Sequence, residues 1–162
     1  MSKEERIGVL FVCMGNICRS PMAEALFRHH AEAEGVLHRF AIDSAGTGGW
    51  HEGEPPDDRM AEVAASRGVH LSGEARQITA DDLDRFQHVM CMDGDNLHKT
   101  RQLGRGNASI ELMLTHYGEV ADMNVPDPYY GGPEGFDRVF ELLDVSCRNL
   151  VRSLIRHTDS VG

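Results

Sequence analysis

Apolar residues along the chain follow two patterns. Short continuous runs lie at 7–12, 39–46, 88–93 and 108–114, and such runs are typical of strands buried on both faces of a sheet. Other segments place apolar residues three and four positions apart, which is the spacing of one helix face. These segments run from Ser20 to about Glu34, over 57–67, 79–86 and 94–103, and from Phe136 to about His157. The pattern therefore predicts strands that alternate with helices.

This alternation favours a parallel sheet with helices on both faces. We expect an α/β fold of three layers, built on a four-stranded parallel sheet in a flavodoxin-like or Rossmann-type arrangement. The 162 residues suit one domain, 1–162, with its own hydrophobic core. Ligands of such folds bind at the carboxyl ends of the strands, beside helix N-termini.

Local signals refine the helix ends and the loops. Ser20 is a plausible N-cap for the first helix, with Pro21 at the first helical position, and Thr79 is expected to cap the short helix at 79–86. Gly68 is expected to end the helix at 57–67. Glycine and proline mark 46–58 and 124–135 as loops.

The net charge of −10 narrows the classes of partner. It argues against nucleic acid and against an anionic membrane, since both attract basic proteins. An anion can still bind, but only in a locally positive pocket. The apolar run near the N-terminus is too short for a signal peptide or a membrane span. We therefore expect a cytoplasmic protein, with secretion by a route that needs no signal peptide left open.

The four cysteines are Cys13, Cys18, Cys91 and Cys147. They form no C-x-x-C pair and have no second ligand pair at zinc-like spacing, so we expect no metal site. Cys91 and Cys147 lie in apolar patterns and are expected in the core. Cys13 and Cys18 lie instead between the first strand and the first helix.

The segment that joins the first strand to the first helix, "CMGNICRS" at 13–20, has the composition of an anion site with a nucleophile in its floor. Gly15 and Asn16 tolerate the left-handed backbone angles of a tight curl. Curled N–H groups ahead of a helix bind anions, and Arg19 adds a planar fork that matches two phosphate oxygens. The same groups would stabilise a thiolate at Cys13. The spacing C-x5-R alone is weak evidence, but its place between a buried strand and a helix is more specific.

"VCMGNICRSPMAE" resembles the active-site loop of low-molecular-weight protein tyrosine phosphatases. Further segments resemble the family in the same order, so that the resemblance covers most of the chain. They are "DSAGTGGWH" at 43–51, "ARQITADDL" at 75–83, "VMCMDGDNL" at 89–97 and "PDPYYGG" at 126–132.

The resemblance implies a reaction and a role for each catalytic residue. Cys13 would attack phosphorus and form a phosphocysteine, and Arg19 would bind the phosphoryl oxygens. Asp127 would protonate the leaving phenolate and then activate water. The expected activity is thus the hydrolysis of phosphotyrosine and of small aryl phosphates.

The resemblance also implies the supporting groups. Ser20 would donate to the Cys13 thiolate, Ser44 would help Asn16 fix the loop, and Asp93 would orient Arg19. The expected phosphate-binding loop comprises Met14, Gly15, Asn16, Ile17, Cys18 and Ser20. The expected walls for the aromatic ring are Ile17, Trp50, Tyr129 and Tyr130.

Cofactors, partners and regulation follow from the same resemblance. No cofactor and no metal are expected. The partners would be phosphotyrosine-containing proteins, with phosphate, sulfate or vanadate able to occupy the loop, and the chain would be a monomer or a weak dimer. Cys18 would protect Cys13 through a reversible Cys13–Cys18 disulfide.

One position departs from the family pattern. Many relatives carry a histidine after the serine of the segment that begins at Ser72, and this histidine supports the loop asparagine, whereas here Gly73 follows. We therefore expect the support of Asn16 to be altered, or to come from His70 or water.

Three alternatives stay open. An arsenate reductase of the same fold would need a pair of cysteines near position 91, but only Cys91 is there. A phosphoarginine phosphatase is expected to carry threonine in place of Ile17. A phosphate-binding module without activity would not need both a thiol in the loop and the proline-framed Asp127.

Overall fold

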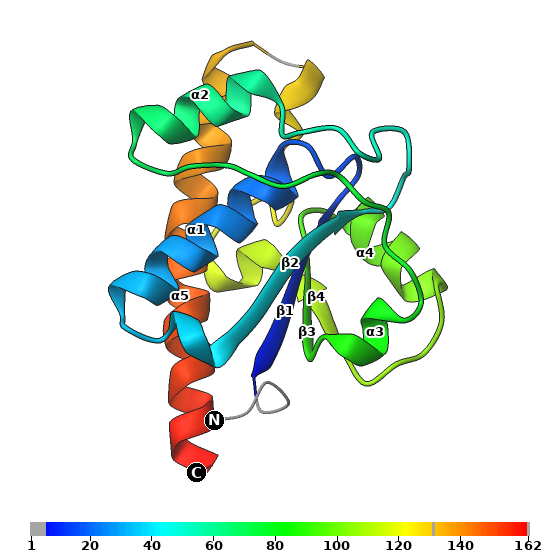
Figure 1. Cartoon of the computed structure of the whole chain (residues 1–162), viewed down its shortest axis with the longest axis vertical. Coiled ribbons are helices and arrows are strands. Elements are labelled where there is room, and N and C mark those ends of the chain that lie inside the picture. Colours follow the sequence, from blue (N-terminus) through cyan, green and yellow to red (C-terminus); the bar gives the residue numbers. More distant parts are fainter. Residues whose placement is uncertain (1–5, 131, 162) are drawn as a thin grey trace.

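A parallel sheet of four strands forms the centre of the computed structural model, which describes residues 6–130 and 132–161 (Figure 1). The strands are β1 (Ile7–Cys13), β2 (Phe40–Gly46), β3 (His88–Cys91) and β4 (Ser109–Leu112). Their order in the sheet is β2-β1-β3-β4, and each neighbouring pair is parallel. This order is the flavodoxin-like one, as predicted.

The strand order places a binding crevice at the carboxyl end of β1. From β1 the chain crosses to β2 on one side, and it later returns to β3 on the other side. Ligands of open α/β sheets bind where the order reverses in this way. Cys13 ends β1 and pairs with Gly46, the last residue of β2. The predicted nucleophile therefore lies at the reversal point.

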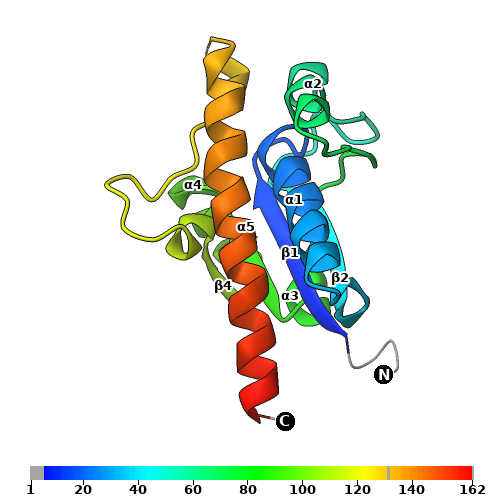
Figure 2. The same ribbon diagram turned by 90° about the vertical axis from the view of Figure 1, so that its left-hand side faces the viewer.

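Helices cover both faces of the sheet. They are α1 (Arg19–Ala33), α2 (Asp58–Ser66), α3 (Asp82–Arg85), α4 (Gly94–Gln102) and α5 (Glu134–Val161), with short 3₁₀ helices η2 (Leu37–Arg39), η3 (Met113–His116) and η4 (Pro128–Tyr130). The helices α1 and α5 pack together on one face, and α3 and α4 lie on the other (Figures 1 and 2). The three-layer prediction is thus confirmed.

The side chains of β1 alternate between two cores. Val9 and Phe11 belong to the larger core beneath α1 and α5, where the Phe11 and Phe27 rings lie 5.6 Å apart. Leu10 and Val12 belong to the smaller core on the other face. All four are fully buried, which explains why β1 is apolar at consecutive positions. None of the described helices is long and apolar enough to cross a membrane.

Two predicted helix starts are wrong. The helix α1 begins at Arg19 with Cys18 as N-cap, because the Cys18 carbonyl already accepts from the Met22 N–H at 3.1 Å. Ser20 therefore lies inside the first turn, where its hydroxyl points into the active-site loop. Pro21 is the third helical residue, which costs nothing because the first turn has unpaired N–H groups.

The second wrong start belongs to the helix predicted at 79–86. In the structure this helix is α3, which has only four residues. Thr79 does not cap it; instead the Asp82 carboxylate accepts from the Thr79 N–H at 2.8 Å. The strand predicted over 108–114 also ends early, since the chain turns into η3 at Met113. Gly68 follows α2 with φ +79°, as expected of a residue that ends a helix.

Candidate active site

The loop at 13–20 joins the end of β1 to the start of α1 and curls around one residue, Asn16. Asn16 has φ 57° and is the only non-glycine residue with positive φ in the described chain. Asparagine tolerates this conformation better than most residues. Gly15 does not have a positive φ. Glycine is needed there for space, because a Cβ at this position would lie 2.9 Å from the His51 ring.

The buried side chain of Asn16 holds the loop in shape. Its amide nitrogen donates to Ser20 Oγ at 2.8 Å and to Ser44 Oγ at 3.0 Å. Its amide oxygen accepts from the Arg76 main-chain N–H at 3.0 Å. Ser44 in turn donates to Glu24 Oε1 at 2.7 Å. The exposed His70 is not needed for this support, so the main chain of residue 76 takes the role that we expected for it.

Ser20 is placed to donate a hydrogen bond to the Cys13 sulfur. The two atoms lie 3.0 Å apart. Because Ser20 Oγ already accepts from Asn16, its own proton is free for Cys13 Sγ, with the Ala45 carbonyl at 3.4 Å as the competing acceptor. The Asn16 N–H also donates to Cys13 Sγ, at 3.2 Å. Two donors therefore converge on the sulfur, and both favour negative charge there.

Arg19 is buried, with 4% of its side chain exposed, and is held from one side by Asp93. One guanidinium nitrogen donates to Asp93 Oδ2 at 2.6 Å and to the Val125 carbonyl at 3.0 Å. Burial alone would lower the pKa of Arg19, but the charges of Cys13 and Asp93 outweigh it and raise the pKa above its ordinary value. The guanidinium is thus a permanent, oriented cation.

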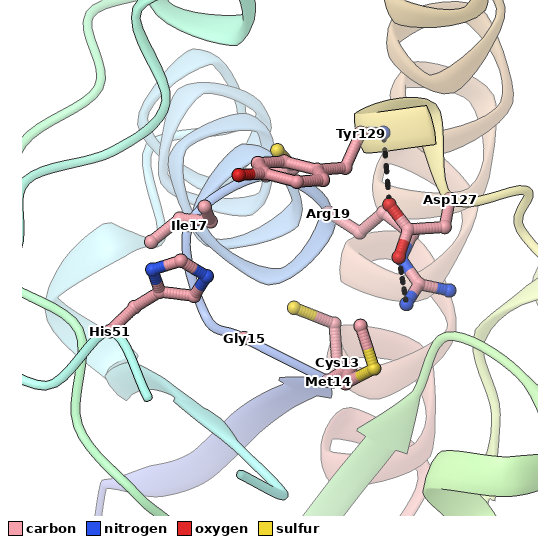
Figure 3. Close-up of a pocket in the computed structure, with 9 residues that line it drawn as sticks. Cys13, Met14, Gly15, Ile17, Arg19, His51, Asp127 and Tyr129 are labelled. Carbon is pink, nitrogen blue, oxygen red and sulfur yellow. Dashed lines mark hydrogen bonds and ion pairs between the residues drawn. The ribbon is translucent and has the colours of Figure 1, made fainter. Parts of the chain in front are cut away.

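Asp127 lies beside Arg19 at the mouth of the site (Figure 3). Asp127 Oδ2 lies 3.5 Å from the second guanidinium nitrogen of Arg19, and Oδ1 accepts from the Tyr129 N–H at 3.0 Å. The carboxyl group is partly exposed, at 27%. Its place between Pro126 and Pro128 keeps the chain extended there, as expected for residues that precede proline.

These groups enclose a cavity of about 40 Å³ above Cys13. Its lining residues are Cys13, Met14, Gly15, Ile17, Cys18, Arg19, His51, Asp127 and Tyr129. Asn16 and Ser20 belong to the loop, but both are buried and do not line the cavity. Figure 3 shows the Tyr129 ring, Ile17 and His51 around the opening, with the Cys13 sulfur pointing into it.

Only some of the predicted wall residues line the cavity. Tyr129 and Ile17 line the cavity, but Trp50 is 69% exposed and does not. The Trp50 ring packs against Gly48, where a Cβ would overlap it. His51 takes the wall position instead. The side chain of Tyr130 lies outside the part of the chain that the structure describes.

His51 is the one lining residue that sequence reasoning missed. Its Nδ1 pairs with the Glu54 carboxylate, and its ring centroid lies 6.2 Å from that of Tyr129. The available signal was the segment "GWHEGE", in which a histidine and a carboxylate three residues later share a short loop.

The other thiols differ from Cys13. All four cysteines are free. Burial, followed by the charge of Asp57, raises the pKa of the Cys18 thiol far above its ordinary value. Burial raises the pKa of Cys91 to about 12, and Cys147 is shifted upward in the same way. Cys91 and Cys147 lie in the core, as predicted. The Cys13–Cys18 disulfide stays a prediction.

The arrangement can bind a tetrahedral oxyanion and attack it. An anion above Cys13 would meet the Arg19 guanidinium and the N–H groups at the start of α1, with a sulfur nucleophile below and a carboxyl group above. Among the described residues, no three His, Cys, Asp or Glu side chains gather as metal ligands do.

Comparisons with known proteins agree with this site and extend over most of the chain. The family model described as low molecular weight phosphotyrosine protein phosphatase matches residues 8–160. The low molecular weight protein-tyrosine-phosphatase YfkJ of Bacillus subtilis (strain 168) is 44% identical over 151 residues, which cover 91% of this chain and 96% of the relative. The low molecular weight phosphotyrosine protein phosphatase of Homo sapiens is 39% identical over 91% of this chain and 96% of its own.

Solved structures agree. The crystal structure of YfkJ superposes with a TM-score of 0.89 and 38% identity, over 96% of this chain and 99% of that one. The crystal structure of DARP, named drosophila arginine phosphatase, superposes with a TM-score of 0.85 and 30% identity, over 90% and 96%.

Proposed function

Because the chain belongs to the low molecular weight phosphotyrosine protein phosphatase family, we propose that it hydrolyses phosphotyrosine in proteins through a phosphocysteine on Cys13. The single observation that supports the mechanism best is the surroundings of the Cys13 sulfur. It accepts a hydrogen bond from the Asn16 N–H, lies 3.0 Å from the Ser20 hydroxyl, and faces a cavity shared with the Arg19 guanidinium and the Asp127 carboxyl group.

The first step transfers the phosphoryl group to sulfur. The Cys13 thiolate forms the S–P bond while the P–O bond to the phenol breaks, and Arg19 neutralises charge on the equatorial oxygens. Arg19 also lies 3.5 Å from the Asp127 carboxyl group. A bound phosphoryl group would compete with Asp127 for that guanidinium. Asp127, in its protonated form, gives its proton to the leaving phenolate.

The second step releases phosphate. The Asp127 carboxylate left by the first step takes a proton from a water molecule as that water attacks phosphorus. The S–P bond breaks, and its electron pair returns to the Cys13 sulfur. Ser20 donates to that sulfur, so it stabilises the thiolate as a leaving group here and as a nucleophile in the first step.

The shape of the mouth favours an aromatic ester. A cavity of about 40 Å³ over Cys13 suits the phosphoryl group alone. A wider cavity of about 270 Å³ adjoins it and shares Ile17, His51 and Tyr129 as lining residues. An aryl ring would lie between these side chains. The outer lining includes the carboxylates of Glu54, Asp57 and Asp58, which would disfavour acidic residues beside the phosphotyrosine.

Replacing Cys13 by serine tests the mechanism. Purified Cys13→Ser protein should hydrolyse p-nitrophenyl phosphate at least ~10³-fold more slowly, because a serine hydroxyl at this site lacks a base to activate it. It should still bind phosphate or vanadate, since the loop N–H groups and Arg19 remain. Full activity of the serine variant would refute the phosphocysteine.

The same assay separates the alternatives. A phosphotyrosine peptide and a phosphoarginine peptide of the same sequence should differ in kcat/KM in favour of phosphotyrosine, because Ile17 narrows the entrance. Arsenate should not be reduced, because Cys91 is buried in β3 and Cys147 in the core. Reduced cysteines are typical of the cytoplasm, and we propose that compartment for the chain.

A further inference from the structure

Arg59 is not one of the residues that line the cavity above Cys13, but it contacts one wall of that cavity. Its guanidinium carbon lies 5.4 Å from the centroid of the Tyr129 ring and 4.7 Å from that of the Phe136 ring, within the range of a cation–π interaction. Phe136 is buried near the start of α5, whereas 40% of Tyr129 is exposed. One cation therefore contacts both a ring of the core and a ring of the active-site mouth.

The Asp57 carboxylate sets the direction of the Arg59 side chain. Asp57 Oδ1 accepts from Arg59 Nε at 3.3 Å, and Oδ2 accepts from a terminal guanidinium nitrogen at 3.1 Å. The same carboxylate caps α2, so its own position is fixed, and only 11% of the Asp57 side chain is exposed. Two hydrogen bonds to one carboxylate orient the plane of the guanidinium. Arg59 is therefore held in place although 49% of its side chain is exposed.

Tyr129 needs contacts to its ring in order to form a fixed wall. It belongs to η4, a 3₁₀ helix of three residues, and its main-chain N–H donates to Asp127. That hydrogen bond fixes the main chain but leaves the side-chain torsion angles free. The ring borders both the catalytic cavity and the wider outer cavity, together with Ile17 and His51 (Figure 3). The contact with the Arg59 guanidinium restricts the direction of this ring.

From this geometry we propose that Arg59 is a positioning residue, which holds the Tyr129 ring in the wall of the mouth and so sets the preference for aromatic over aliphatic phosphate esters. This inference rests on the proposed function. An aryl group gains from a wall that is already ordered, because less side-chain entropy is lost when the ligand binds. The phosphoryl group does not share this gain, since it would meet the loop and Arg19 instead.

Arg67 makes a similar contact at the other end of α2 without reaching the active site. Its guanidinium carbon lies 4.7 Å from the centroid of the Phe140 ring of α5, and it pairs with Asp137 at 3.0 Å. It lines neither of the two cavities at the mouth. A role in joining α2 to α5 would be shared by both arginines, whereas the contact with Tyr129 belongs to Arg59. Arg67 is therefore the matched control.

Benzylphosphonate and methylphosphonate are the matched probes, because they share the phosphonate and differ in the aromatic ring. Arg59→Gln should weaken benzylphosphonate binding about threefold, as expected for the loss of one exposed cation–π contact, and should leave methylphosphonate binding unchanged. Arg67→Gln should change neither affinity. NMR titrations of the full chain measure both affinities. Equal weakening of both probes would show that Arg59 acts through its charge, and equal effects of both substitutions would show that it acts through helix packing. Either result would overturn the proposal.

A double-mutant cycle tests whether the effect of Arg59 passes through the Tyr129 ring. In the Tyr129→Ala background, Arg59→Gln should cause little further loss of benzylphosphonate affinity, because the ring that it positions is absent. Additive losses would show that Arg59 acts on the ligand by another route and would overturn the proposal. Thermal unfolding of the single and double variants checks that each is folded at the temperature of the titrations.

The kinetic readout depends on the proposed function. Arg59→Gln should lower kcat/KM for phenyl phosphate by about the factor found for benzylphosphonate, with kcat nearly unchanged, since the groups that perform the chemistry keep their contacts. A fall in kcat with unchanged KM would contradict a positioning role. The binding titrations need no turnover. A protein that binds the probes but hydrolyses no aryl phosphate would refute the proposed function, and the titrations would still decide the role of Arg59.

Discussion

At the scale of single residues, Asn16 combines two properties that no other described residue shares. It supplies the left-handed turn of the loop and is also a buried donor and acceptor for three separate segments. Glycine would allow the turn, but Ser20 and Ser44 would each lose a donor and the Arg76 N–H would lose its acceptor. A buried group costs about 1–3 kcal/mol when it is unpaired. The shape of the loop therefore depends on this one side chain.

Asp127→Ala should slow hydrolysis most for esters with poor leaving groups. A phenolate of high pKa needs a proton as it departs, and Asp127 is the carboxyl group beside Arg19 at the mouth of the site. A series of substituted phenyl phosphates should show a steep dependence of kcat/KM on leaving-group pKa in the variant and a shallow one in the wild type. Parallel dependences would remove Asp127 from the role of general acid.

Alkylation with iodoacetamide at pH 7 should modify Cys13 first. The thiolate is the reactive form, and burial raises the pKa of Cys18, Cys91 and Cys147, which keeps them protonated. Peptide mass mapping of the native protein should find the label on Cys13, and phosphate should slow its attachment. Rapid labelling of Cys18 in the native state would contradict the raised pKa of its thiol.

Most of the residues that line the cavity above Cys13 could be predicted from the sequence, whereas the wall residue His51 could not. Cys13, Arg19 and the loop belong to one short segment whose chemistry is local. The position of Trp50 depends instead on its packing against Gly48, and the position of His51 depends on its pairing with Glu54. His51 therefore lines the cavity where Trp50 was expected, because side-chain direction in an irregular segment is set by tertiary contacts.

At the scale of elements, α2 depends on a single cap. Asp57 accepts from the main-chain N–H groups of Arg59 and Met60, at 2.8 and 3.3 Å. Burial alone would raise the pKa of Asp57, but hydrogen bonds from the Arg59 side chain and these N–H groups lower it below its ordinary value. A lowered folded-state pKa stabilises the protein above the unfolded-state pKa, and that stability is lost as the pH falls through the folded-state pKa.

Asp57→Ala should reduce the free energy of unfolding at pH 7 by about 1 kcal/mol, because the cap is lost. Asp58→Ala is the matched control, since Asp58 lies in the first turn and is not the N-cap, and it should cost less. Urea denaturation of both variants and the wild type measures the difference. Equal losses would show that the charge of the first turn, and not the cap, stabilises α2.

Elements were easier to predict than their ends. The strands are continuous apolar runs because both faces of the sheet are covered, and this pattern is visible in the sequence. The start of α1 cannot be read from the sequence, because the hydroxyl of Ser20 could either cap the helix or hydrogen-bond to the Cys13 sulfur. In the structure this hydroxyl lies 3.0 Å from the Cys13 sulfur, and Cys18 is the N-cap of the helix, which begins at Arg19. Competing uses of one side chain are decided by the complete fold.

At the scale of the whole molecule, Arg76 joins separate parts of the fold through buried Asp82. Two parallel hydrogen bonds of 3.0 Å connect them, and Arg76 also reaches Asp43 in β2. Burial alone would raise the pKa of Asp82, but the Arg76 guanidinium and the Thr79 N–H lower it below its ordinary value of 3.8. The pair thus stabilises the fold fully above about pH 4 and loses this effect as the pH falls through the lower folded-state pKa.

Asp82→Asn should lower the free energy of unfolding at pH 7 by roughly 2 kcal/mol, because a charged hydrogen-bonded pair is broken. The gap between variant and wild type should narrow in strongly acidic solution, where the wild-type carboxylate also becomes protonated. Thermal unfolding followed at several pH values measures this. A gap that stays constant down to about pH 2 would mean that Asp82 acts through its shape and not its charge.

The hydrogen bonds of the loop also order events during synthesis. Arg19 is held by Asp93 and by the carbonyl of Val125, which follow it by 74 and 106 positions, and Asp127 comes later still. Cys13 therefore leaves the ribosome long before Asp93, Val125 and Asp127, which complete the site. Until that late segment has emerged and docked, the growing chain carries its cysteine without a completed phosphate site. Hydrolysis thus begins only once nearly the entire polypeptide exists.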